Sequence, residues 1–453
     1  MNFKINIPKE AKWLIHELNI LDYEAYVVGG CVRDSLLGKK PKDWDICTDA
    51  KPENVMDIFR IHGLEVIETG LQHGTVTIHF PSGNNYEITT FRVDGKYSDG
   101  RHPDSVEFID DITADLARRD FTINAVAYND EDGLIDPFWG AKDLRMKIIR
   151  CVGDPDKRFQ EDSLRILRAM RFASTYGFQI VHKTIDAMDR NRSLLHNISA
   201  ERIRDELCKI LCGNNVLHVL LNYSNIIAEI IPEMRACIGF EQNNPYHEYD
   251  VYGHIAHAVS GYKGGDISVK VALLLHDIGK PNIYVTDERG RGHFYGHPAV
   301  SHEMAKHILE RLKFDNKTKD EILELVLYHD VEIKASRKIA RRLLNKLGID
   351  RVKQLIEVKR ADILSHSNKA HGSRLPNLQE FSEIVDDVIA ESECFKIKDL
   401  AVNGNDICAL GVSGPMVGRV LNHLLDKVID ETLENDRDSL INEAKKFIKE
   451  DLI

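Results

Sequence analysis

The stretch VVGGCVRDSLLGKKPKDWDICT, residues 27–48, carries more information about this chain than any other. Asp43 and Asp45 stand two apart beside an apolar run of strand character, so an extended backbone would point both carboxylates to one side of a sheet. Paired carboxylates suit Mg²⁺ bound together with substrate phosphates. Upstream, the Gly-Gly pair ending at Gly30 lets backbone amides approach a ligand, and Arg33 offers a planar fork of donors to phosphate oxygens. The stretch predicts a site that binds a nucleoside triphosphate together with a metal ion.

Four later segments, together with this stretch, carry a resemblance to a known protein family. In order, they are RRDFTINA (118–125), DPFWGAKDLRMKIIR (136–150), EDSLRILRAMRF (161–172) and ISAERIRDEL (198–207). Together the five segments resemble the class II tRNA nucleotidyltransferases, the CCA-adding enzymes, and their relatives the bacterial poly(A) polymerases. They cover roughly the first half of the chain. The resemblance implies a polymerase-beta-like head followed by neck, body and tail helices, with tRNA, CTP and ATP as partners.

Length and charge limit the alternatives. The chain has 453 residues, enough for about three domains at ~150 residues each. Its net charge of −12 argues against a surface that is basic throughout, so RNA contacts must be local and no DNA partner is expected. The eight cysteines form no CxxC pair, and the sequence has neither a signal peptide nor a long apolar run. We therefore predict a cytoplasmic protein without a membrane partner; the oligomeric state stays open.

Hydrophobic periodicity predicts an α+β fold, with a small mixed β-sheet head and an all-helical remainder. The region between residues 23 and 150 is rich in strand-like runs separated by turn residues, with a helix predicted over 52–62. From about residue 154, apolar positions recur at three and four, as in helices. The predicted domains are a nucleotidyltransferase head (1–150), a neck and body for base and RNA binding (151–240), an HD domain (241–366) and a tRNA-binding tail (367–453).

The resemblance assigns roles in the head. Asp43 and Asp45 would bind Mg²⁺ as catalytic ligands, and Glu87 is a candidate third carboxylate. Arg119 would bind the nucleotide, with Asp120 and Asn124 near the ribose. The segment 89–105 resembles the family's flexible loop associated with adding the terminal A.

The helix predicted over 161–172 carries a candidate template for base selection. Cytosine and adenine present an amine donor beside a ring-nitrogen acceptor, whereas uracil and guanine present the reverse. Asp162 accepting from the amine and Arg165 donating to the ring nitrogen would hold C or A and reject U or G. Arg168 and Arg171, each three residues further on, would meet the triphosphate. A charged outer helix face is the competing interpretation.

A second metal site is predicted in the helical half. His254, the pair His276 and Asp277, and Asp362 stand in the order of the HD-domain phosphohydrolases. Neutral imidazoles with carboxylates suit a transition metal such as Ni, Mn, Co or Fe. Further imidazoles that could hold a second ion are those of His297, His302 and His329. This module could trim damaged RNA 3′ ends.

Two interpretations remain open from the residues alone. The basic stretch 334–360 could hold tRNA phosphates or could be a solvated helix face.

We predict addition of CCA to tRNA with release of pyrophosphate. The alternatives are a poly(A) polymerase or an enzyme that adds only the final A, an HD-type hydrolase with an inactive head, and a non-catalytic RNA-binding module.

Overall fold

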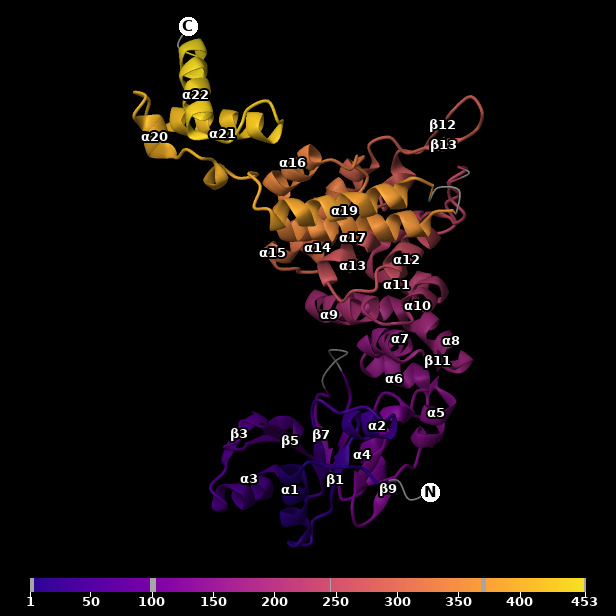
Figure 1. Cartoon of the computed structure of the whole chain (residues 1–453). Helices are drawn as coiled ribbons and strands as arrows, with labels where there is room; N and C mark the ends of the chain where they lie inside the picture. The colour runs from indigo at the N-terminus through magenta and orange to yellow at the C-terminus, as the bar shows by residue number, and fades with distance from the viewer. Residues whose placement is uncertain (1–3, 98–102, 245, 368–371, 452–453) are drawn as a thin grey trace. The chain divides into compact units, whose positions relative to one another are not determined.

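The computed structural model describes residues 4–97, 103–244, 246–367 and 372–451. The chain forms two compact units, Met1–Pro232 and Glu233–Ile453, and each is described by itself (Figure 1). The first unit holds the strand-rich head and the helices that follow it, whereas the second is almost wholly helical. The predicted α+β class is confirmed. No helix in the described part of the chain combines the length and apolar character needed to cross a membrane.

A seven-stranded mixed sheet organises the head. Its strand order is β3-β4-β5-β2-β1-β8-β9, and only β2 and β5 run parallel to each other. The strands are β1 (Ala25–Val28), β2 (Ile46–Thr48), β3 (Glu65–Gly70), β4 (Thr75–His79), β5 (Asn85–Thr90), β8 (Ala127–Asn129) and β9 (Gly133–Ile135). A separate hairpin pairs β6 (Arg92–Asp94) with β7 (Val106–Phe108). Residues 98–102 of the predicted flexible loop lie outside the described residues.

Helices cover both faces of this sheet. On one face, α1 (Lys9–Asn19) and α3 (Pro52–Ile61) bury Leu14 and Phe59 against the strands. The helix predicted over 52–62 is thus confirmed, with Pro52 in the first turn, where its missing N–H costs nothing. On the other face, α4 (Ile112–Ala117) packs Leu116 against strand residues. The short α2 (Gly30–Leu36) follows β1 directly.

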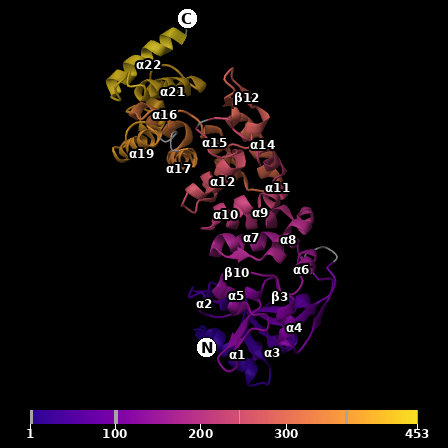
Figure 2. The same cartoon turned by 90° about the vertical axis from the view of Figure 1, so that its right-hand side faces the viewer.

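The rest of the first unit is helical apart from one tiny sheet, in which β10 (Ile148–Ile149) pairs with β11 (Gln179–Ile180). Figure 2 gives a second view of these helices and of those in the second unit. The first-unit helices are α5 (Gly140–Met146), α6 (Pro155–Glu161), α7 (Leu164–Tyr176), α8 (His182–Asn191), α9 (Ala200–Leu211), α10 (Val216–Asn222) and α11 (Ser224–Ile230).

The second unit contains two further apolar cores, one around Phe381 and one around Leu424. Its one hairpin joins β12 (Val285–Thr286) to β13 (Gly292–His293), so this half is not all-helical. Its helices are α12 (Val251–Gly261), α13 (Ile267–Leu275), α14 (His297–Arg311), α15 (Asn316–Tyr328), α16 (Arg337–Leu347), α17 (Ile349–Ser365), α19 (Arg374–Ala390), α20 (Gly404–Cys408), α21 (Pro415–Ile429) and α22 (Arg437–Asp451).

Two local predictions are wrong. Asp43 and Asp45 precede β2, which begins at Ile46, although the Asp45 carbonyl still accepts from the Val28 N–H at 2.9 Å. The segment 161–172 is not one helix: α6 ends at Glu161, and α7 begins at Leu164. Asp162 is extended, and its carboxylate caps the Leu164 N–H at 3.1 Å, in competition with helical backbone bonding.

Candidate functional site

Three carboxylates gather on the face of the head sheet turned away from α1 and α3. The parallel register of β2 and β5 pairs Ile46 with Ile88, which places Asp45 beside Glu87 one step earlier on each strand. Asp43, two residues before Asp45, shares its side of the chain. All three acids are exposed, and among the described residues none of their side chains has an ion-pair or hydrogen-bond partner. The glutamate that the sequence offered only as a candidate thus lies next to the aspartates.

Electrostatics mark Asp45 as the centre of this cluster. Although Asp45 reaches solvent, protein atoms crowd its carboxylate, and this partial loss of water is the first cause that raises its pKa; the charges of Glu87 and then Asp43 add to it, while Arg119 acts in the opposite direction. Like charges held this close repel one another unless a cation lies between them. The donor set is therefore one that fits a divalent metal ion.

Arg119 lies beside the glycine turn that ends β1. A side chain at Gly29 would bring its Cβ to 3.0 Å from Arg119 Nη1, and the φ of 76° there favours glycine. Asp115 holds Arg119 from the other side, with Oδ2 3.3 Å from Nη2. Within the described residues Arg119 Nε has no hydrogen-bond partner but is buried, so an incoming group would have to meet the terminal nitrogens of this guanidinium.

Arg33 is engaged by the protein. It is only 8% exposed, its Nη1 donates to Asn124 Oδ1 at 2.7 Å, and its Nε donates to Asp34 at 2.9 Å. The guanidinium also stacks on Phe172 of α7, 5.2 Å from the ring centroid. Gly30 opens α2 directly before it. In this arrangement Arg33 joins α2 to α7 rather than pointing at a ligand.

A cavity of about 410 Å³ is lined both by one of the three carboxylates, Glu87, and by the predicted base-reading pair, Asp162 and Arg165. Asp162 Oδ2 accepts from Arg202 at 3.0 Å. Arg165 is held by Glu161 at 2.8 Å, and its other contacts are two backbone carbonyls at 3.2 Å. The two side chains share one cavity although they do not lie on one helix.

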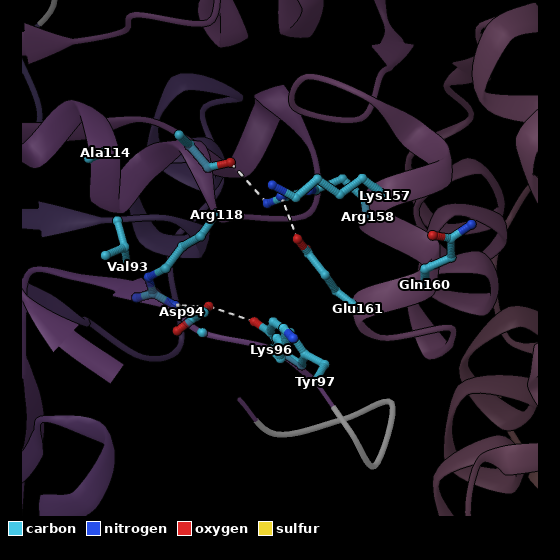
Figure 3. Close-up of a pocket in the computed structure, with 12 residues that line it drawn as sticks. Val93, Asp94, Lys96, Tyr97, Ala114, Arg118, Lys157, Arg158, Gln160 and Glu161 are labelled. Atoms are coloured by element: carbon cyan, nitrogen blue, oxygen red, sulfur yellow. Dashed lines mark hydrogen bonds and ion pairs between the residues drawn. The ribbon is translucent and has the colours of Figure 1, made fainter. Parts of the chain in front are cut away.

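A neighbouring hollow of about 640 Å³, whose lining residues Figure 3 shows, shares a wall with this cavity; the wall consists of Asp94, Tyr97 and Arg118, residues to which the sequence analysis gave no role. In the wall, Tyr97 donates to Asp94 Oδ2 at 2.6 Å, and Arg118 Nη1 lies 3.6 Å from the same oxygen. On the far side, Arg158 bonds Glu161 at 2.6 Å. The sequence signal for this wall was the pair of adjacent arginines, Arg118 and Arg119, in RRDFTINA. The sequence analysis assigned a role only to Arg119.

The remaining predicted arginines of α7 form ion pairs. Arg168 donates to Asp120 Oδ2 from Nε at 2.8 Å and from Nη2 at 2.6 Å. Although burial opposes it, Arg168 and then Asn124 lower the pKa of Asp120 to about 2. Arg171 pairs with Glu206 of α9 at 3.1 Å. These pairs fasten α7 to its surroundings beside the cavity.

The second unit gathers its predicted ligands around one small space. His254 Nε2 lies 3.2 Å from His276 Nε2, 3.2 Å from Asp277 Oδ2 and 3.0 Å from Asp362 Oδ1. Atoms that share one ion at about 2.1 Å in neighbouring octahedral positions lie about 3 Å apart, so these separations fit a metal. His254 comes from α12, His276 and Asp277 follow α13, and Asp362 comes from α17.

Asp277 links this group to a second one. Its other oxygen, Oδ1, lies 3.2 Å from His297 Nε2 and 3.6 Å from His329 Nε2. His302, in contrast, lies beside Glu303 at 3.1 Å and joins neither group. The geometry is that of a carboxylate between two cation positions.

The other ring nitrogens hold these imidazoles in place. The Nδ1 atoms of His276, His297 and His329 lie 2.7–2.9 Å from backbone carbonyl oxygens. His254 Nδ1 meets Ser365 Oγ at 3.0 Å, and that hydroxyl donates to a backbone carbonyl, so it accepts from the ring. Each Nε2 therefore points a lone pair inward, as in metal-binding histidines.

The buried carboxylate at the centre also fits a cation. Neither oxygen of Asp277 accepts a hydrogen bond of good geometry, although Lys280 Nζ lies 2.6 Å from Oδ2. The Lys280 ammonium is the cation that lies beside this carboxylate. A cavity of about 320 Å³ opens onto this group and is also lined by Asp362 and Arg374.

The basic stretch 334–360 is largely neutralised within the second unit. Arg341 is 8% exposed and pairs with Glu431, and Arg342 Nη2 lies 2.5 Å from Asp430 Oδ1. Arg337 pairs with glutamates in the same way. These contacts favour a structural role for α16.

Comparison with known proteins gives a consistent result. A model of the poly A polymerase head domain matches residues 25–150, and a model of tRNA nucleotidyltransferase domain 2 matches residues 295–444. The fold and the carboxylate cluster define a nucleotidyltransferase.

Two full-length relatives narrow the class. The chain is 31% identical to the CCA-adding enzyme of Ligilactobacillus salivarius over 458 residues, 98% of each protein. The crystal structure of the Bacillus stearothermophilus CCA-adding enzyme in complex with CTP superimposes with a TM-score of 0.70 at 29% identity, covering 98% of both chains. The chain belongs to the family of CCA-adding enzymes.

Proposed function

We propose that this chain adds C, C and A to tRNA 3′ ends, using CTP and ATP and releasing pyrophosphate. The observation that carries the proposal is the open cluster of Asp43, Asp45 and Glu87 beside a cavity lined by Asp162 and Arg165. Family membership supports the same reaction, since the relatives bear the name CCA-adding enzyme.

In this proposal Asp43 and Asp45 hold Mg²⁺, with Glu87 as a third ligand. The metal would lower the pKa of the attacking hydroxyl and neutralise charge on the triphosphate. Arg119, whose Nη1 lies beside the Gly29 turn, would donate to the nucleotide. Arg168 and Arg171 would meet the triphosphate by leaving Asp120 and Glu206.

Base selection would come from Asp162 and Arg165. Arg165 holds its two backbone carbonyls at 3.2 Å, the long end of hydrogen bonding, so a base can replace them at little cost. A wrong base would leave polar groups unpaired in the cavity, at about 1–3 kcal/mol each.

The test is incorporation of label into tRNA transcripts that lack the final A, CA or CCA, with each triphosphate supplied singly. Labelling of the CCA-less transcript from CTP supports the proposal. If ATP but not CTP labels any of the transcripts, the A-adding alternative is favoured. Long A tails would favour a poly(A) polymerase.

The second unit would carry a metal-dependent phosphohydrolase. His254, His276, Asp277 and Asp362 would hold one ion, with His297 and His329 completing a second position through Asp277. A transition metal such as Ni, Mn, Co or Fe suits this imidazole-rich set. Such ions supply a nucleophilic hydroxide near neutral pH.

The substrate class proposed for this second site is a damaged RNA 3′ end. The purified protein with Mn²⁺ or Ni²⁺ is expected to add water across one P–O bond of an RNA 2′,3′-cyclic phosphate and leave a terminal phosphomonoester; a second hydrolysis would release inorganic phosphate. If neither the opened ring nor inorganic phosphate is detected with either ion, the role is dropped. The regions 151–240 and 367–453 would bind RNA.

A further inference from the structure

Trp139 stands out on the surface of the first unit. The turn before α5 displays its indole with 70% of the residue exposed, unusual for an aromatic of this size. The backbone there has φ 64°, a left-handed conformation that costs a non-glycine residue about 1 kcal/mol or more. Lys147, at the other end of α5, is also left-handed at φ 56°. Strained residues of this kind concentrate at functional positions.

The surrounding structure fixes this turn. Asp136 accepts from the Gly140 N–H at 2.6 Å and from the Ala141 N–H at 2.9 Å. Any side chain at Gly140 would overlap the Thr122 carbonyl oxygen, so the chain passes closely over the head at this point. Trp139 is therefore held outward rigidly, without burying its ring.

The indole borders a hollow of about 390 Å³ whose rim carries positive charge. Arg150 and Lys183 line it together with Trp139. Arg150 contacts Asp143 at 3.0 Å but remains 48% exposed at its side chain, and no ion pair of Lys183 occurs within the described residues. Residues 139–150 contain four Lys or Arg against one acid, the buried Asp143.

This surface is separate from the proposed catalytic cavity. The two hollows have no lining residue in common. Lys142 Nζ lies over the indole, 5.8 Å from the ring centroid, so the cations surround the ring in a chain whose net charge is −12; a local basic group of this kind is the electrostatic pattern of a nucleic-acid contact.

We propose that this surface, Trp139 with Arg150 and Lys183, binds an unpaired nucleotide of the RNA substrate. The base would stack on the indole, and the cations would meet its phosphate. Stacking explains the exposed ring because every base has a π-face, and the cations give the salt-dependent attraction of a phosphate site. The volume is of the order that holds a small ligand.

The test uses Trp139→Gly, which removes the ring while relieving the left-handed strain. The added chain entropy of glycine offsets that relief, so the melting temperature is expected to stay close to that of the unaltered protein. Anisotropy of a labelled CCA-less tRNA transcript, measured without CTP, is expected to show a roughly tenfold weaker Kd. Lys183→Gln should lower the slope of log Kd against log salt by about one.

Two controls make the result specific. Ile61→Ala removes another exposed apolar side chain, on α3, and should leave the Kd unchanged. A blunt RNA duplex should bind both proteins equally, because it offers no unpaired base. The proposal is overturned if Trp139→Gly binds the transcript within twofold of the unaltered protein, or if it loses duplex affinity to the same extent. The anisotropy is measured without CTP and so does not depend on catalysis; CTP incorporation by Ile61→Ala, whose altered side chain lies outside both hollows, tests the catalytic proposal separately.

Discussion

The two candidate metal sites differ in how completely the protein builds them. In the head, the side chains of Asp43, Asp45 and Glu87 are exposed and have no protein partners within the described residues. In the second unit, His254, His276 and Asp277 are 1% exposed or less, and the imidazoles are oriented by hydrogen bonds behind them. The head resembles an open acid surface that substrate completes, whereas the second site is fixed before anything binds.

The secondary structure explains the contrast. Residues at the start of a strand are held by one backbone ladder and can face solvent, and here Asp45 is tied to β1 by the Val28 N–H at 2.9 Å. Ligands contributed by several helices must converge in the interior, where each polar atom needs a partner. A site that admits a triphosphate and an RNA end needs the first design, and a small phosphate group can use the second.

The largest expected effect is in the head. Asp45→Asn keeps the shape but removes a charge from the proposed metal ligands, so nucleotide incorporation should fall roughly a thousandfold or more, corresponding to several kcal/mol. Single-turnover incorporation from CTP into CCA-less tRNA measures this. Glu87→Gln should cost less, because two carboxylates remain. Equal activity of Asp45→Asn and the unaltered protein would remove Asp45 from the site.

The second site should respond through metal content. His276→Ala is expected to lose bound Mn²⁺ or Ni²⁺, measured by elemental analysis after dialysis, and to lose any cyclic-phosphate hydrolysis with it, while CTP incorporation continues. His302→Ala is the matched control, because His302 contacts Glu303 outside the cluster. If His276→Ala retains metal at full stoichiometry, the preformed-site interpretation fails.

A third prediction concerns what holds the open site in shape. The pKa of Asp120 is lowered to about 2 from an ordinary value near 3.8, so its ionised form stabilises the folded first unit by about 2 kcal/mol. That contribution is fully present above about pH 4 and is lost as pH falls through 2. Asp120→Asn should remove it at pH 7 and flatten the acid dependence of urea unfolding. Metal binding by the second unit should not change.

The exposed pair Asp189 and Arg192 provides the control for this experiment. Its oxygen and nitrogen lie 2.5 Å apart, but Asp189 is 56% exposed at its side chain, and surface pairs contribute little. Asp189→Asn should leave the unfolding midpoint where it was. If Asp189→Asn lowers the free energy of unfolding as much as Asp120→Asn does, the stability of the first unit responds to any change of charge.

The sequence predicted features that depend on neighbouring residues better than it predicted which distant residues contact each other. The helix over 52–62 was predictable because its period and Pro52 act locally. The convergence of His254, His276, Asp277 and Asp362 was predicted only through the family resemblance, and the structure brings these residues together.

What the sequence could not supply were contacts made across the fold. Arg33 reads as a phosphate donor until Asn124 and Asp34 are seen to hold it. The placement of Glu87 depends on parallel pairing between β2 and β5, a long-range register that no local pattern encodes. For the cations of α16 the sequence left open a solvated helix face or an RNA surface, and only the fold places the acids at 430 and 431 beside them.

The smallest expected effect tests how the open site chooses its base. Arg165→Ala removes the proposed donor to the ring nitrogen of C or A, and one such hydrogen bond discriminates by about 1–3 kcal/mol. The ratio of kcat/KM for CTP to that for UTP should therefore fall roughly tenfold or more. Arg190→Ala, which removes an exposed arginine paired with Asp156, is the control and should leave the ratio unchanged. An unaltered ratio in Arg165→Ala would mean that other groups in the cavity select the base. The base selectivity of the open site would then not depend on a donor that substrate binding has to recruit.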